Sequence, residues 1–196
     1  MARQVIGATA AALVFGGALA ASRQHADAAQ LLSKLSSSRV TLVDGIRQAE
    51  KSDGPAISAK FEMKEGQLLL SVYTARQGRD RDAEHNTLME LIGPATDATW
   101  KLETEIFADK EHLVRSAMQL TLMQLTRMSL AGVIKKAEGQ QPGTVYSAIP
   151  AVQGGRPVVD VLLATRDGQS KHDCSQPGGA TRRHRLGPQR RPRNRQ

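Results

Sequence analysis

Two stretches of the chain, 88 residues apart, decide the fold: VTLVDGIRQAE at residues 40–50 and MSLAGVIKKAE at residues 128–138. In both stretches a Leu, an Ile and an Ala-Glu pair recur at helical spacing behind a Thr or a Ser. The hydroxyl of Thr41 or Ser129 is placed to accept a hydrogen bond from a free amide of the first helical turn. The two stretches therefore predict two similar helices, each with its own N-cap, and hence a repeated unit.

Each predicted helix ends at a Pro/Gly break and is followed by two strand-like segments around a glycine turn. The segments are AISAKFEM (56–63) and QLLLSVYTA (67–75) after the first helix, and TVYSAIPAV (144–152) and RPVVDVLLAT (156–165) after the second. Apolar residues alternate along them, which is typical of antiparallel strands with one packed face. We therefore expect an α+β protein in which a helix on a small antiparallel sheet occurs twice.

This order of cap, Leu, Ile, Ala-Glu, Pro/Gly break, strand, glycine turn and strand resembles the PepSY domain. The resemblance covers residues 40–75 and 128–167. Its shared positions are packing positions, so it assigns no catalytic or ligand-binding residue. It implies cystatin-like units, an extracytoplasmic location and a role in restraining peptidases. PepSY units are also similar to the propeptides of thermolysin-like metallopeptidases.

Residues 29–106 are assigned to the first unit, including an extra hairpin. The added strands are TLMELIG (87–93) and TWKLETEIFA (99–108), which flank a Gly-Pro loop. Alternation in the second strand predicts one packed face and one solvated face. The packed row would be Trp100, Leu102, Thr104 and Ile106.

Residues 107–127 are expected to form a helix that joins the two units, with Asp109 as its N-cap and an end near Leu125. Its apolar residues cover more than half of its circumference: Leu113, Val114, Ala117, Met118, Leu120, Leu122, Met123 and Leu125. Such a helix is usually buried on two sides. We therefore expect a long apolar helix between the units or across a homodimer interface, with a plain core helix as the simpler alternative.

Residues 1–28 have the layout of a secretory signal peptide. Arg3 precedes an uncharged stretch at 5–21, and a small-residue cleavage site, ADA, ends at Ala28. Cleavage is expected after Ala28, with Ala20 as the alternative. The stretch falls short of the roughly 20 strongly apolar residues of a stable span, so an N-terminal anchor is the weaker interpretation. The mature chain is expected to be periplasmic or secreted, without a membrane span.

The net charge of +8, from 27 Lys and Arg against 19 Asp and Glu, belongs to the C-terminal end. Residues 170–196 carry +7 and residues 1–27 carry +1, so residues 28–169 are neutral, with 17 basic and 17 acidic residues. A neutral body with few aromatic residues lacks the basic surface and the stacking platform of nucleic-acid binders. We therefore expect no specific nucleic-acid partner.

Residues 128–169 are assigned to the second unit, which is expected to be incomplete because no third strand is apparent after it. Residues 170–196 are rich in Arg and Pro, with Leu186 as the one large aliphatic residue, and such a segment is expected to be disordered. Three interpretations stay open: a basic tail for anionic lipid or nucleic acid, a solvated tail without a role, and a shifted reading frame near Gln169. The shifted frame is favoured, because GC-rich DNA read out of frame often encodes Arg, Pro, Gly, His and Gln.

Candidate chemistry is sparse. The densest group of possible metal ligands is Asp80, Asp82, Glu84 and His85. Alternating acids in a loop are suited to calcium, but interleaved arginines offset their charge, so a solvated polar loop is favoured. The sequence has no HExxH pair, phosphate loop or GxSxG elbow, and the single Cys174 makes no cysteine zinc site. We therefore expect neither an enzyme nor a bound cofactor.

The sequence thus favours an exported PepSY-type binding module that restrains or regulates a periplasmic peptidase by protein contact. The alternative is an envelope protein that binds a metal or a ligand through the acidic loop 80–85. A homodimer through the connecting helix is compatible with the same pattern.

Overall fold

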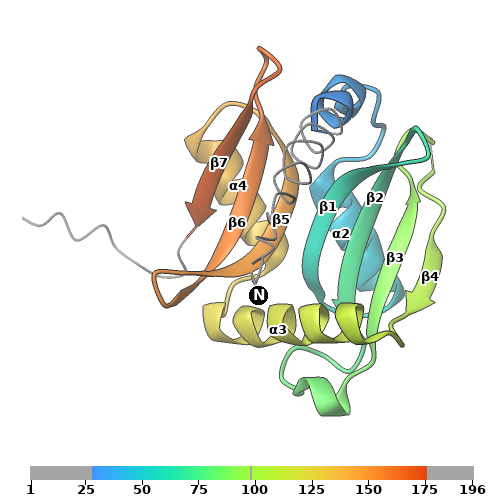
Figure 1. Cartoon of the computed structure of the whole chain (residues 1–196), viewed down its shortest axis with the longest axis vertical. Coiled ribbons are helices and arrows are strands. Elements are labelled where there is room, and N and C mark those ends of the chain that lie inside the picture. Colours follow the sequence, from blue (N-terminus) through green and yellow to red (C-terminus); the bar gives the residue numbers. More distant parts are fainter. Residues whose placement is uncertain (1–27, 98, 176–196) are drawn as a thin grey trace, which may run out of the picture.

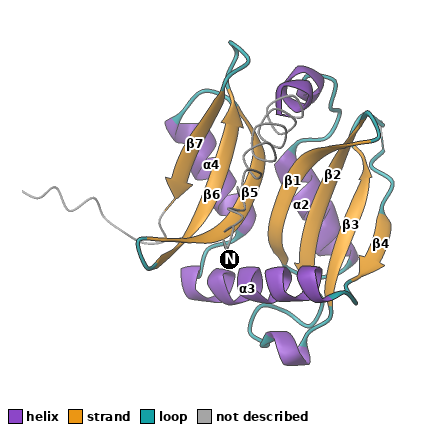
Figure 2. Ribbon diagram, in the orientation of Figure 1, coloured by secondary structure: helices purple, strands orange, loops and turns teal. Residues whose placement is uncertain are grey.

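The computed structural model of the chain describes residues 28–97 and 99–175. Its elements are α2 (Leu42–Ser52), β1 (Ala56–Lys64), β2 (Gln67–Ala75), the 3-10 helix η1 (Ala83–His85), β3 (Leu88–Pro94), β4 (Glu103–Ile106), α3 (Lys110–Thr126), α4 (Leu130–Gln140), β5 (Thr144–Gln153), β6 (Arg156–Ala164) and β7 (Ser170–Ser175). Residues 28–35 are helical as well. The strands form one antiparallel sheet in the order β4-β3-β2-β1-β5-β6-β7 (Figures 1 and 2). The predicted α+β class is confirmed.

The two helix starts lie where the sequence predicts them. Helices α2 and α4 each have 11 residues and begin 88 positions apart. The Thr41 hydroxyl accepts from the Asp44 amide and the Ser129 hydroxyl accepts from the Gly132 amide, both at 3.1 Å. Each cap satisfies an amide that would otherwise lack a helical partner.

The two halves of the chain share one sheet. Helix α2 packs on β1 and β2, and α4 packs on β5 and β6. Strands β1 and β5 are antiparallel neighbours, paired at Ala59↔Ala148 and Lys60↔Ser147. Outward from this seam the strands follow the same order in both halves, β1-β2-β3 on one side and β5-β6-β7 on the other. The halves are therefore related by an approximate twofold axis. Each half contains one helix over three strands, and β4 extends the first half.

The core lies between the sheet and α2 and α4, and α3 crosses the opposite face (Figure 1). Ile46 and Ile134, at matching positions of the two helices, have no solvent-exposed surface. Burying such a side chain contributes about 1.5–3 kcal/mol. On the other face, Gln119 of α3 meets Ser58 of β1. Leu120 and Met123 of α3 also belong to the hydrophobic core, so the connecting helix bridges the halves on the face opposite α2 and α4.

Strand β7 corrects the expectation that disorder begins at residue 170. Residues 170–175 pair with β6 from Ala164↔Ser170 to Val159↔Ser175, so the second unit has its third strand and is not incomplete. Apolar alternation does not reveal this strand, because SKHDCS holds no large apolar residue; the strand forms by backbone pairing along the edge of β6. The rest of the predicted tail, residues 176–196, lies outside the described residues.

The extra hairpin is confirmed, but its second strand is shorter than predicted. Strands β3 and β4 pair from Met89↔Ile106 to Ile92↔Glu103, and every residue of β4 is exposed. Trp100 is buried ahead of the strand and donates its indole N–H to the Gly93 carbonyl at 3.1 Å. The predicted burial is therefore confirmed for Trp100 and wrong for Ile106, because β4 forms the edge of the sheet.

Helix α3 occupies the predicted segment, with the Asp109 carboxylate accepting from the His112 amide at 3.0 Å. Its expected burial on two sides is wrong. Val114, Met118 and Leu125 are 62%, 50% and 61% exposed, whereas Ser116, Gln119 and Thr126 are buried. Leu120, Leu122 and Met123 are buried as predicted, so the helix has one buried side of mixed polarity, and several of its other apolar residues face solvent.

The predicted signal peptide falls on residues 1–27, outside the described part of the chain, and on Ala28. Leu31 and Leu35 join the hydrophobic core, and both remain in the mature chain with either predicted cleavage site. Within residues 28–97 and 99–175, no helix has the length and apolar character needed to cross a bilayer.

Candidate functional site

The acidic loop does not gather its four candidate ligands around one point. Asp82 caps η1: its Oδ1 accepts from the His85 amide at 3.1 Å and lies 2.6 Å from His85 Nδ1. This hydrogen bonding from His85 lowers the pKa of the Asp82 carboxyl. Asp80 and Glu84 are exposed. In the described residues no three His, Cys, Asp or Glu side chains converge as a metal site would require.

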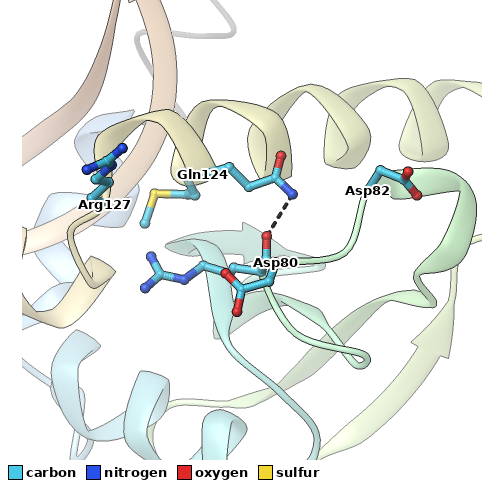
Figure 3. Close-up of a pocket in the computed structure, with 6 residues that line it drawn as sticks. Asp80, Asp82, Gln124 and Arg127 are labelled. Atoms are coloured by element: carbon cyan, nitrogen blue, oxygen red, sulfur yellow. Dashed lines mark hydrogen bonds between the residues drawn. The ribbon is translucent and has the colours of Figure 1, made fainter.

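An open hollow of about 700 Å³ lies beside this loop (Figure 3). It is lined by Arg79, Asp80, Asp82, Met123, Gln124 and Arg127. Gln124 Nε2 donates to the carbonyls of Arg79 and Arg81 at 2.7 and 2.9 Å, so α3 holds the loop in place. In Figure 3 the Asp80 and Asp82 side chains point in different directions. The hollow thus carries both signs of charge, and its acids do not act together.

A smaller cavity, of about 50 Å³, lies where α3 crosses the junction of β1 and β5. We call it the seam pocket; it is lined by Ser58, Ala59, Lys60, Ser71, Tyr73, Arg115, Gln119 and Ile149. A single water needs about 10–15 Å³ of such space. The seam pocket is therefore of the size of one small ion or a few waters.

The polar side chains around the seam pocket are held by specific hydrogen bonds. The Ser58 hydroxyl donates to Gln119 Oε1 at 2.8 Å, and the Ser71 hydroxyl donates to the carboxylate of Glu90 on β3. Gln119 is 3% exposed. Its carbonyl oxygen is occupied by Ser58, and its amide nitrogen has no hydrogen-bond partner among the described residues.

Burial sets the ionisation of the two acids next to the seam pocket. It raises the pKa of Tyr73 to about 12, with the charges of Glu90 and Glu62 adding to the shift and Arg115 opposing it. Burial also raises the pKa of Glu90, against the hydrogen bond from Ser71. Tyr73 therefore keeps its proton at neutral pH and can donate it in a hydrogen bond. Its ring is fixed edge-on against Phe107, with the ring centres 4.8 Å apart.

Sequence reasoning missed the seam pocket because its residues come from β1, β2, α3 and β5, which are distant in the chain. One signal was present. Glu90 interrupts the apolar run of β3, and Ser58 and Ser71 stand within apolar strands. Polar residues inside strands that are buried on both faces indicate a polar site beneath a covering element.

Comparison with protein-family models, with curated proteins and with solved structures finds no match to this chain. The PepSY resemblance therefore remains a prediction from the sequence.

Proposed function

We propose that this chain is an exported binding module that acts by protein contact and restrains or regulates a periplasmic peptidase. The observation that supports it best is an apolar stripe on the solvent side of α3. Val114, Met118 and Leu125 lie on one helical face, because they are separated by four and seven residues. Each is at least half exposed. Contiguous apolar patches of this kind are typical of contact surfaces.

The inner side of α3 explains why this stripe faces outward. Ser116 donates to the His112 carbonyl, and Thr126 donates to the Met123 carbonyl at 2.9 Å. Gln119 bonds to Ser58 on the sheet. The hydroxyls of Ser116 and Thr126 are thus satisfied by carbonyls of the helix itself and Gln119 by the sheet, while Val114, Met118 and Leu125 remain on the solvent side. Thr121 lies within the stripe and donates to the Ala117 carbonyl at 2.9 Å, so its polar atom also turns back to the helix.

A peptidase is the proposed partner because of the PepSY resemblance, which occurs twice behind a segment with the layout of an export signal. The mode of contact is that of an amphipathic helix against an apolar groove. Anchors spaced by four and seven residues suit such a groove. A second copy of the chain is the other partner that the same stripe would suit.

The test is inhibition of purified periplasmic metallopeptidases by the mature chain, measured by hydrolysis of a fluorogenic peptide. Wild type should slow one of the peptidases, and Met118→Glu should weaken the inhibition at least tenfold. Val152→Glu is the matched control, because Val152 is 59% exposed and lies on β5, outside the stripe on α3. Lack of inhibition by wild type would contradict the proposal, as would equal inhibition by both variants. Sedimentation equilibrium of the three proteins tests the second copy as partner.

The second candidate function is ligand or metal binding at the acidic loop 80–85, and the adjacent hollow favours it. Calorimetry with calcium and with zinc, on the mature chain and on the Asp80→Ala/Asp82→Ala variant, tests this. Binding by wild type that the variant loses would support it.

A further inference from the structure

We propose that the seam pocket binds a small oxyanion, a carboxylate, sulfate or phosphate group, between the two halves of the sheet. This proposal is independent of the protein-contact function. It rests on three features of the pocket: the donors that remain unused, the balance of charge at its wall, and its size.

The unused donors come from two buried residues. Ser58 occupies the carbonyl oxygen of Gln119, so the two N–H groups of that amide are what Gln119 can offer to a ligand. Tyr73 is 5% exposed and keeps its phenolic proton, since its pKa is about 12. A ligand that supplies acceptor oxygens at this point would satisfy both groups.

The charges at the pocket wall favour an anion. Lys60 and Arg115 both line the cavity. Lys60 is paired with Glu62, whereas Arg115 forms no ion pair with a carboxylate in the described residues. Another nearby acid, Glu90, is bonded to Ser71, and burial raises the pKa of its carboxyl. The Arg115 guanidinium hydrogen-bonds to Tyr73, but a guanidinium has five N–H groups, so others are left for the oxygens of a carboxylate, sulfate or phosphate, to which this side chain is best matched.

The size of the pocket limits the ligand. Sites for drug-sized molecules occupy about 300–1,000 Å³, and the seam pocket has about 50 Å³. It therefore suits a single oxyanion group and excludes a whole nucleotide or sugar. Because its walls come from both halves and from α3, a bound anion would also hold the halves together and raise the stability of the fold.

The experiment is thermal unfolding of the mature chain in acetate, sulfate or phosphate, against chloride at equal ionic strength. Binding predicts a saturable rise of the midpoint, and the three arms show whether a planar or a tetrahedral oxyanion is preferred. Arg115→Gln should raise the concentration for half-saturation at least tenfold, and Tyr73→Phe should raise it by a smaller factor. Arg156→Gln, which makes the same charge change at the exposed first residue of β6, should leave it unchanged.

Two outcomes would overturn the proposal. One is a midpoint that rises without saturation and equally in all four proteins, which is a general salt effect. The other is a saturable rise that Arg115→Gln and Tyr73→Phe leave intact, which places the anion elsewhere. Nuclear magnetic resonance gives a second readout, in which the Gln119 side-chain N–H signals should shift with the titration; unshifted signals would also count against the pocket.

Discussion

Helix α2 lies so close to β2 that Gly45 has no room for a side chain. A Cβ at this position would stand 2.2 Å from Leu70 Cδ2 and 3.5 Å from the Trp100 ring. Leu70 has no exposed surface, so it cannot swing into solvent to make space. Forcing extra volume into a packed core typically costs about 1–3 kcal/mol. Better helix propensity offsets about 1 kcal/mol of this cost, so Gly45→Ala should destabilise the protein by a net amount of up to about 2 kcal/mol.

Gly139 of α4 provides the matched control. A Cβ at Gly139 meets nothing within 4 Å, so Gly139→Ala should retain the propensity gain and stabilise by up to about 1 kcal/mol. The two variants should thus differ by about 1–3 kcal/mol, which is the overpacking term alone. Urea unfolding followed by circular dichroism measures this difference. Equal stability of the two variants would refute the close approach of α2 to β2.

The repeat suggests a rescue for this variant. The position that matches Gly45 in the second half is Val133, and the position that matches Leu70 is Val159. The first half thus combines a small helix residue with a large strand residue, and the second half has two of intermediate size. Gly45→Ala/Leu70→Val should lose less stability than the sum of its single changes.

Three further predictions concern the pH dependence, the caps and the last strand. Glu90 has a folded-state pKa above its ordinary value of 4.5, so its contribution to stability is complete at low pH and is lost as pH rises through the folded pKa. In urea unfolding, the free energy of unfolding of Glu90→Gln relative to wild type should rise between pH 4 and pH 7.5. A difference between the two proteins that does not change with pH would contradict this. Thr41→Ala and Ser129→Ala should each lower the free energy of unfolding by about 1 kcal/mol; a loss in only one would show that the two helices are not equivalent. Truncation after residue 169 removes β7 and leaves the edge of β6 unpaired, so the truncated chain should unfold at lower urea and self-associate in sedimentation; wild-type behaviour would show that β7 contributes nothing.

The features that could be predicted from the sequence are local. A hydroxyl followed by apolar residues at helical spacing specifies the starts of α2 and α4 within a few residues. Alternation around a glycine turn specifies each hairpin in the same way. The β1–β5 seam has no such signal, because it consists of two residue pairs between segments that are 88 residues apart.

The errors at α3 and β7 have a shared cause. Counting apolar residues around α3 does not reveal which side meets the sheet; Gln119 turns inward because Ser58 on β1 is its partner there, and Ser116 is accommodated on the same side because its hydroxyl bonds to the His112 carbonyl of its own helix. Strand β7 likewise depends on distant partners: it pairs with the backbone of β6, His172 pairs with Asp160 on β6, and Ser170 bonds to Tyr146 on β5. In both cases a tertiary partner overrides the local pattern.

The candidate site was predicted only in part. The sequence identified the loop 80–85 as polar, but the hollow beside it also needs Gln124 and Arg127, which lie about 40 residues further along the chain. The seam pocket draws on four elements and had no predicted residue. Sites assembled from distant elements follow from topology, which the local periodicity does not determine.

The central claim is that this chain acts by protein contact through the outer face of α3. The most direct test places a photo-crosslinking amino acid at position 118 of the chain in its native cells, with position 152 as the control. The account predicts that position 118 captures a periplasmic peptidase, identified by mass spectrometry, and that position 152 does not. Capture of no protein at position 118 beyond those seen at position 152 would contradict the claim.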